Sequence, residues 1–147
     1  MDPRSERIRE WMDGTRHLAP ITELLGITPV EVGRGDVTLA MEAGTRFHSP
    51  LGRVHGGIIV DLADAAMGTA TAMVLDDGDS FVTTDLHVAY LKSVRDGRVT
   101  ARAVVIKEGR TTIYLEAEVR QGDSLIARLS STCVVQRSRG PVNAATS

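Results

Sequence analysis

The stretch from Ile58 to Leu75 constrains the fold more than any other part of the chain. Apolar residues recur on almost every side of a helix drawn through it, and Asp61 and Asp64 are its only charged residues. A helix without a polar face is normally surrounded by protein. Its many alanines, together with Gly68, would let a sheet approach closely. We therefore expect one long helix with the rest of the chain folded around it.

Segments with the character of β-strands lie on both sides of this helix. Two precede it and are separated by Gly33-Arg34-Gly35, a hairpin signal. Four follow it, and the links between those four are short and turn-like, which predicts antiparallel neighbours. The expected strands are Thr28–Val32, Asp36–Glu42, Phe81–Leu91, Arg98–Lys107, Thr111–Arg120 and Ser124–Gln136.

The two ends of the chain differ from this central pattern. Apolar spacing predicts a helix over Ser5–Leu18, and a second one over Pro20–Leu25 that Gly26 would end. The polar tail Ser138–Ser147 is expected to be disordered. The prediction is an α+β fold, with an antiparallel sheet wrapped around one long central helix. We expect this fold to be a single domain over residues 1–137, with a helical segment at about residues 1–26.

Composition excludes several classes of function. The chain has 147 residues and a formal net charge of -2, which argues against a general nucleic-acid binder. It lacks an apolar run long enough for a membrane span and an N-terminal signal pattern, so we expect a cytoplasmic protein. Cys133 is the only cysteine, and the four histidines lack the spacing of a zinc site. No metal and no separate cofactor are expected.

The start of the long helix carries the most informative pattern, Ser49-Pro50-Leu51-Gly52-Arg53-Val54-His55-Gly56-Gly57. Two adjacent glycines let a ligand approach the backbone closely. The first N–H groups of a helix lack partners within it and carry the positive end of the helix dipole. A carbonyl oxygen placed there would find a preorganised site for developing negative charge.

Asp61 and Asp64 follow on one side of the same helix. A carboxylate in an apolar helix is costly unless it is paired or functional. Asp61 lies near the first turn and is well explained by the helix dipole. Asp64 lies about one turn deeper, where that explanation weakens, and a site of this kind can tune a carboxylate for work as a base or nucleophile.

Helix geometry sets a limit on how these groups can cooperate. Gly56 and Asp64 are eight residues apart, which is roughly 12 Å along a helix at ~1.5 Å per residue. That is too far for both to touch one carbonyl carbon. Together with the exposed edges and outer face of a single sheet, this predicts a homo-oligomer with a dimer as its smallest unit and the site between subunits.

This pattern resembles the hotdog-fold thioesterases of the phenylacetic-acid-degradation type. Their motif reads Asn-x-x-Gly-x-x-His-Gly-Gly, with an acid seven positions after the last glycine. The chain matches it at Gly52, His55, Gly56, Gly57 and Asp64, and the likeness extends in order through most of residues 20 to 137. The resemblance implies an acyl-CoA thioesterase, with CoA as part of the substrate, and a tetramer built from paired dimers.

The resemblance also implies roles for the matched positions. Asp64 would be the general base or nucleophile, and the Gly56 N–H would polarise the thioester carbonyl. His55 would orient that end of the site, with loop bonding as an equally good explanation. Thr83 matches a position where similar enzymes place a hydroxyl near the attacking water, although threonine is also a common strand residue.

Ser49 is a departure, because the family motif has Asn there. Serine would act through water, or the neighbouring His48 would replace the Asn. CoA contacts are implied at Gly57 and Tyr90, and at the turn formed by Lys107, Gly109, Arg110 and Thr111. Lys107 and Arg110 could pair with phosphate, as could Arg137, a weaker candidate. An ordinary charged hairpin explains this turn equally well.

Two alternative functions stay open at this stage. One is a hotdog dehydratase acting on a 3-hydroxyacyl thioester, although such enzymes pair a catalytic His with an acid in other sequence contexts. The other is an acyl-CoA-binding or sensor module without catalysis. Ser49 favours the binding module, and the presence of Asp64 argues against it.

Overall fold

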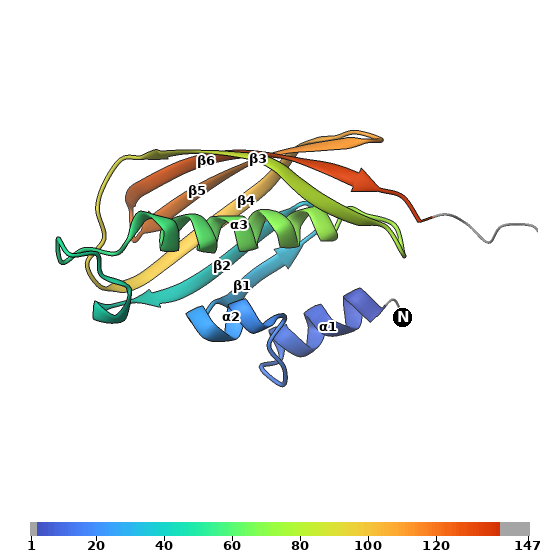
Figure 1. Ribbon diagram of the computed structural model, residues 1–147. Coiled ribbons are helices and arrows are strands. Elements are labelled where there is room, and N and C mark those ends of the chain that lie inside the picture. Colours follow the sequence, from blue (N-terminus) through green and yellow to red (C-terminus); the bar gives the residue numbers. More distant parts are fainter. Residues whose placement is uncertain (1–2, 139–147) are drawn as a thin grey trace, which may run out of the picture.

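The computed structural model describes residues 3–138, and these form three α-helices, one short 3-10 turn and a six-stranded antiparallel sheet (Figure 1). None of the helices in this part of the chain has the length and hydropathy that a membrane crossing requires. The elements in chain order are α1 (Pro3–Met12), α2 (Pro20–Leu25), β1 (Thr28–Gly33), β2 (Asp36–Ala43), α3 (Gly56–Ala72), β3 (Ser80–Tyr90), β4 (Gly97–Glu108), β5 (Thr112–Gln121) and β6 (Ser124–Gln136).

The long helix α3 lies along one face of the sheet and forms the centre of the core (Figure 1). Its residues Leu62, Ala63 and Ala66 are completely enclosed. Alternate side chains of the strands, such as Leu39 and Val99, close over them. Alanine occupies so much of this interface that helix and strands can approach closely, at the packing density of a protein interior. The expected α+β arrangement, a sheet wrapped around one central helix, is confirmed.

The order of the strands differs from the prediction in one respect. The order is β1-β2-β4-β5-β6-β3, so β3 pairs with β6 and not with β4. The expectation that the strands at Phe81–Leu91 and Arg98–Lys107 are antiparallel neighbours is therefore wrong. The link between them turns across the end of the sheet instead, where the backbone N–H groups of Leu91 and Lys92 donate to the Ile126 carbonyl.

The position of β3 leaves a long strand at the edge of the sheet. Within residues 3–138, β3 pairs with β6 on one side only. Most of its side chains are exposed, and Val82 keeps 51% of its surface accessible. A bulge between Thr83 and Asp85 interrupts its register with β6. Such an edge offers unpaired backbone groups to another strand.

The N-terminal helices show how turn residues set helix ends. Helix α1 ends at Met12, not at Leu18 as predicted, because Gly14 adopts a left-handed conformation (φ 74°). The Gly14 N–H donates to the Trp11 carbonyl and the Thr15 N–H to the Glu10 carbonyl, which is a Schellman termination. Helix α2 spans Pro20–Leu25 as predicted and ends at Gly26 in the same way.

Helix α3 begins and ends earlier than the apolar run Ile58–Leu75 suggested. It starts at Gly56, because the two glycines are part of its first turn and His55 is its N-cap. It ends at Ala72, where the Arg4 guanidinium donates to the carbonyls of Ala72, Leu75 and Asp79. An arginine from α1 thus satisfies carbonyl groups at the C-terminal end of α3.

A polar cluster fixes the chain beyond β6. The buried carboxylate of Asp79 accepts hydrogen bonds from the Arg137 guanidinium at 2.8 Å and from the Ser138 N–H at 2.8 Å. These bonds, the Ser138 N–H first and Arg137 second, hold the pKa of Asp79 below its usual range. Arg137 and the Ser138 N–H are thereby held against Asp79 at the start of β3, and the predicted domain boundary at residue 137 stays a prediction. The rest of the expected disordered tail, residues 139–147, lies outside the described residues.

Candidate active site

The loop before α3 is held in one shape by its own hydrogen bonds. The Ser49 hydroxyl accepts from the Leu51 N–H at 3.3 Å, and the Ser49 N–H donates to the Arg53 carbonyl at 2.7 Å. His48 Nε2 lies 2.7 Å from the Arg95 carbonyl oxygen and ties the loop to the link before β4. His48 Nε2 is thus engaged in loop structure, and the hypothesis that His48 replaces the family asparagine stays a prediction.

The first turn of α3 offers one backbone N–H group to a ligand. His55 Nδ1 accepts from the Gly57 N–H at 3.1 Å, so the imidazole caps the helix and occupies that donor. Among residues 3–138, the Gly56 N–H donates no hydrogen bond. Gly56 is therefore the position where the helix N-terminus can bind a carbonyl oxygen, and Gly57 serves the cap.

Tyr90, at the end of β3, packs directly over Gly56. A Cβ atom on Gly56 would lie 2.8 Å from the Tyr90 hydroxyl oxygen and 2.9 Å from its ring carbon Cζ. A glycine is thus needed for the ring to lie this close. A hollow of about 390 Å³ brings Ser49, Gly56 and Tyr90 together, with Leu51 and Ile59 among its apolar walls. These three predicted site residues meet at one end of the molecule.

Asp64 lies on the accessible side of α3, about two turns after Gly56. Its surroundings withhold enough water to raise its pKa, because burial disfavours the charged carboxylate. The negative charge of Asp61 raises the pKa of Asp64 further. A carboxylate with a raised pKa, on the open side of an otherwise enclosed helix, is suited to accept a proton or to attack a carbonyl carbon.

Thr83 lies beside Cys133 of the neighbouring strand β6. Its hydroxyl oxygen is 3.8 Å from the sulfur of Cys133, and that sulfur is 3.7 Å from the hydroxyl of Thr71. Thr71 is seven residues beyond Asp64, roughly 10 Å further along the helix. Within one chain Thr83 therefore belongs to the region of the C-terminal half of α3, and its role near the attacking water stays a prediction.

The hairpin between β4 and β5 lies at the opposite end from Gly56. The Gly109 N–H donates to the Thr112 carbonyl, and a Cβ on Gly109 would lie only 2.5 Å from that oxygen, so glycine is required there. Arg137 donates to the Arg110 carbonyl and joins the hairpin to Asp79, beyond the C-terminal end of α3.

The predicted phosphate-binding cations differ in whether they already have partners within the protein. Arg137 already binds Asp79 and the Arg110 carbonyl, so it has fewer donors to offer a phosphate, and its role as a phosphate ligand stays a prediction. Lys107 and Arg110 form no side-chain ion pair within residues 3–138 and extend from an exposed turn, beside Thr111. They can still reach an anionic ligand.

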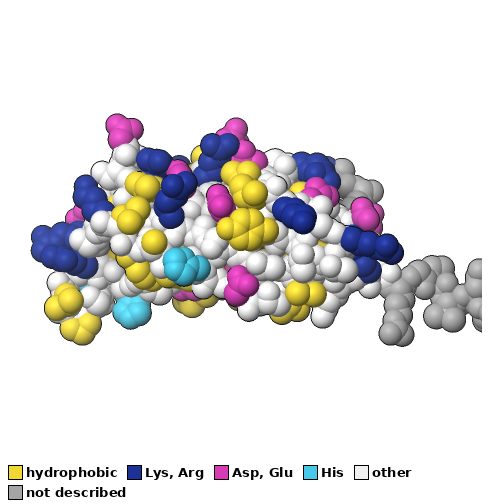
Figure 2. All heavy atoms as spheres, turned by 90° about the horizontal axis from the view of Figure 1, so that it is seen from above, with side chains coloured by type: hydrophobic (Ala, Val, Ile, Leu, Met, Phe, Trp, Pro, Cys, Tyr) yellow, Lys and Arg dark blue, Asp and Glu magenta, His cyan; other side chains and the backbone are white. Residues whose placement is uncertain are grey.

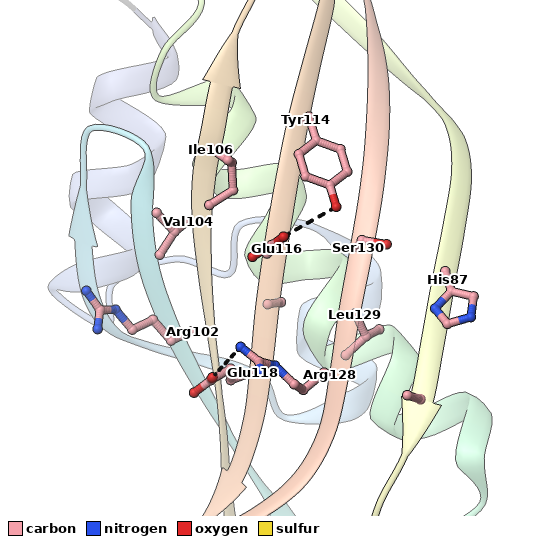
Figure 3. Close-up of a pocket in the computed structure, with 12 residues that line it drawn as sticks. His87, Arg102, Val104, Ile106, Tyr114, Glu116, Glu118, Arg128, Leu129 and Ser130 are labelled. Atoms are coloured by element: carbon pink, nitrogen blue, oxygen red, sulfur yellow. Dashed lines mark hydrogen bonds and ion pairs between the residues drawn. The ribbon is translucent and has the colours of Figure 1, made fainter.

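The outer face of the sheet carries a separate hollow of about 590 Å³, on the side away from α3 (Figure 3). The apolar side chain of Val104 lies beside a row in which Glu118 pairs with Arg128 across neighbouring strands, and Ile106 lies further along the same strand. Figure 2 shows the same face, with hydrophobic groups between basic and acidic ones. This hollow is lined by His87 but by none of the predicted site residues, and it lies on the other face of the sheet from α3, which carries Gly56 and Asp64.

Two features of the site were not predicted from the sequence. A third hollow, of about 480 Å³, opens beside Gly68. Its signal in the sequence is the spacing of four residues between Asp64 and Gly68, which places a residue without a side chain next to the carboxylate. The second is the capping of α3 by Arg4, which left no pattern in the sequence. Within residues 3–138 no group of His, Cys, Asp and Glu could hold a metal ion.

Residues 51–127 match the family model of the thioesterase superfamily. A conserved protein from Pseudomonas aeruginosa has a solved structure that superposes with a TM-score of 0.79, at 32% identity, covering 87% of this chain and 98% of that one. A thioesterase from Haemophilus influenzae superposes with a TM-score of 0.75, at 30% identity, covering 80% and 82%. The 1,4-dihydroxy-2-naphthoyl-CoA hydrolase of Listeria monocytogenes is 28% identical over 120 residues, covering 81% of this chain and 98% of the relative.

The capping role of His55 can be tested by substitution. His55→Ala removes the acceptor of the Gly57 N–H and is expected to lower the free energy of unfolding by about 1 kcal/mol. His55→Asn, which keeps a strong capping side chain, should retain most of that stability. Urea denaturation of both variants measures the difference. Equal destabilisation by Ala and Asn would contradict the capping role.

Proposed function

Because this chain belongs to the thioesterase superfamily and has its hotdog fold, we propose that it hydrolyses an acyl-CoA thioester to the free acid and CoA. The observation that carries the proposal is Asp64, a carboxylate of raised pKa on the one accessible side of an otherwise enclosed helix. The name of the Listeria relative, a naphthoyl-CoA hydrolase, supports CoA as the thiol. The acyl-CoA-binding module remains the alternative, because the Ser49 hydroxyl oxygen already accepts a hydrogen bond from the Leu51 N–H.

The chemistry requires a base and a group that stabilises an oxyanion. In one route, Asp64 takes a proton from water while the water oxygen attacks the thioester carbonyl carbon. In the other, the carboxylate attacks that carbon directly, and water hydrolyses the mixed anhydride after the CoA thiolate has left. Negative charge then develops on the carbonyl oxygen. The Gly56 N–H donates to it, at the positive end of the α3 dipole. Collapse of the tetrahedral intermediate breaks the carbon–sulfur bond and releases the CoA thiolate, which takes up a proton.

Asp64 and Gly56 of one helix are too far apart to act on the same carbonyl, so the site is formed by two subunits. Strand β3 supplies the means, because its free edge can pair with the β3 of a second copy. A two-fold axis makes this pairing antiparallel. Tyr90, which covers Gly56, then approaches the Phe81 end of the partner strand. The N-terminus of the partner's α3 is thereby brought alongside the stripe that contains Asp64.

The same symmetry accounts for the CoA contacts. The hairpin containing Lys107 and Arg110 lies at the far end of its own chain from Gly56, but a two-fold axis brings it toward the Gly56 end of the partner. Its cations can then pair with the phosphates of a CoA whose thioester lies at Gly56 and Tyr90. The dimer is the smallest unit that this arrangement allows, and the outer face of the sheet is open to a further pairing into a tetramer.

Substitution of Asp64 separates catalysis from binding. Asp64→Asn is expected to abolish most thiol release across a panel of acyl-CoAs, because the amide cannot accept the proton. Asp61→Asn is the matched control: it lies on the same side of the helix and removes the same charge. It should keep activity. Equal rates for Asp64→Asn and the parent would contradict the assignment, and saturable CoA-ester binding by an inactive parent would favour the binding module.

The pH profile follows from the raised pKa of Asp64. Thiol release should fall as the pH drops through that pKa, because the protonated carboxyl is neither base nor nucleophile. Asp61→Asn should move this acidic limb to lower pH, since the charge of Asp61 is the second cause of the raised pKa. The folded state favours protonated Asp64, so stability is lost as the pH rises through its pKa. The thermal midpoint of Asp64→Asn should therefore equal or exceed that of the parent at neutral pH.

The oxyanion role of Gly56 can be tested without breaking the helix. Proline is well tolerated as the first residue of a helix, and His55 already has the extended backbone (φ -60°, ψ 134°) that proline requires before it. Gly56→Pro removes the N–H and should lower kcat about 100-fold or more. Gly56→Ala keeps the N–H but adds the same Cβ against Tyr90, which is 52% exposed and can move aside. Equal losses in both variants would assign the effect to crowding.

A further inference from the structure

The hollow of about 480 Å³ lies between the N-terminal helices and the C-terminal half of α3. Helices α1 and α2 form one side, and α3 with the first residues of β3 forms the other. The size falls within the range of about 300–1,000 Å³ that is common for small-ligand sites. Its walls are predominantly apolar and include Ile8, Leu18, Ile21, Ala65, Gly68 and Phe81.

The hollow continues the accessible stripe of α3 that contains Asp64. Asp64, Gly68 and Ala72 are spaced by four residues, so they lie on one side of the helix, and none of the three is fully buried. Gly68 is roughly 6 Å beyond Asp64 along the helix axis. With no side chain at Gly68, nothing from α3 closes the path between the carboxylate and the hollow. The nearest group to a Cβ at this position would be the Phe81 ring, at 3.7 Å.

Most of the polar groups around the hollow are already occupied, whereas the exposed guanidinium of Arg7 lies at its solvent side. The Thr22 hydroxyl donates to the Ala19 carbonyl at 2.7 Å, and the Thr69 hydroxyl donates to the Ala65 carbonyl at 2.8 Å. Arg4 is bound to carbonyl groups at the end of α3, and Asp79 is bound by Arg137. A ligand inside would therefore meet apolar surface, so an apolar chain fits and a polar one would lose its hydration without compensation.

We propose that this hollow binds the acyl group of the substrate and selects apolar acyl chains long enough to pass Gly68. The proposal rests on the hydrolysis proposed above, because Asp64 defines where the thioester carbonyl lies. An acetyl group ends next to the carboxylate and gains nothing from the hollow. A longer aliphatic or arylalkyl group extends along the stripe past Gly68 and covers the side chain of Ile21, which is 48% exposed.

The outer wall comes from a part of the chain beyond the family match. The match covers residues 51–127, whereas α1 and α2 lie within residues 3–25. The carboxylate and the glycine end of the site belong to the matched region. Selection among acyl groups would then depend on the N-terminal helices, which Arg4 fastens to the end of α3. A substitution at Ile21 would thus change the acyl preference while the catalytic residues stay the same.

Two pairs of variants test the proposal on the intact protein. Gly68→Leu fills the path, whereas Gly68→Ala adds only a Cβ at ordinary contact distance from Phe81. Ile21→Ser makes the rim polar, and Leu24→Ser is its control, because Leu24 is also on α2 and 68% exposed but does not line the hollow. The measurement is kcat/KM from thiol release with straight-chain acyl-CoAs from acetyl to dodecanoyl.

For the parent, kcat/KM should rise roughly threefold to tenfold per methylene until the hollow is filled. Gly68→Leu should lower the ratio of octanoyl to acetyl kcat/KM at least about tenfold, and Ile21→Ser should lower it severalfold. Gly68→Ala and Leu24→Ser should follow the parent. Suppose that the parent hydrolyses acyl-CoAs and that Gly68→Leu and Ile21→Ser both keep its chain-length profile. This result would overturn the acyl site alone. A parent inactive on every acyl-CoA would overturn the proposed hydrolysis with it.

Discussion

The burial of α3 is the interaction on which the remaining structure depends. A helix that is apolar on nearly every side must exclude water along its length, and a six-stranded sheet lying along it does most of that work. The sheet cannot reach the whole circumference. One narrow stripe, from Gly57 through Asp61 and Asp64 to Ala72, stays accessible. The candidate carboxylate Asp64 lies on this stripe, which carries the exposed residues of the helix, Gly57, Asp61 and Asp64.

The same constraint explains why the proposed site needs a second subunit. The two groups that a thioester requires, an N–H donor at Gly56 and a carboxylate at Asp64, are fixed on one rigid helix and separated along its axis. No side-chain rotation can bring them together. A two-fold partner can, because it presents its own helix start in the opposite direction. In the proposed dimer, the edge of β3, which would otherwise favour aggregation, is the surface through which the two copies pair.

Much of this architecture could be predicted from the sequence, and the failures have physical causes. The apolar run identified α3, and alternating residues placed the strands to within about a residue, because both patterns are local. The pairing of β3 with β6 was missed because a short link after Tyr90 limits distance but does not decide which strand is the neighbour. The early end of α1 was missed although Gly14 signalled it. In the site, the candidates Gly56 and Asp64 came from residue type, spacing and the family resemblance, and their roles stay predictions. The engagement of His48 and Arg137 did not, since it depends on carbonyl groups distant in sequence.

The most direct test of a shared site uses two inactive chains. Asp64→Asn and Gly56→Pro are co-expressed with different tags, and oligomers that carry both tags are purified. In a mixed dimer, the Asp64 of the Gly56→Pro chain faces the intact Gly56 of the other chain, so one of two sites is restored. Thiol release should then reach about half that of the parent dimer. If the mixed oligomers are no more active than either variant alone, each site lies within a single chain and the account is contradicted.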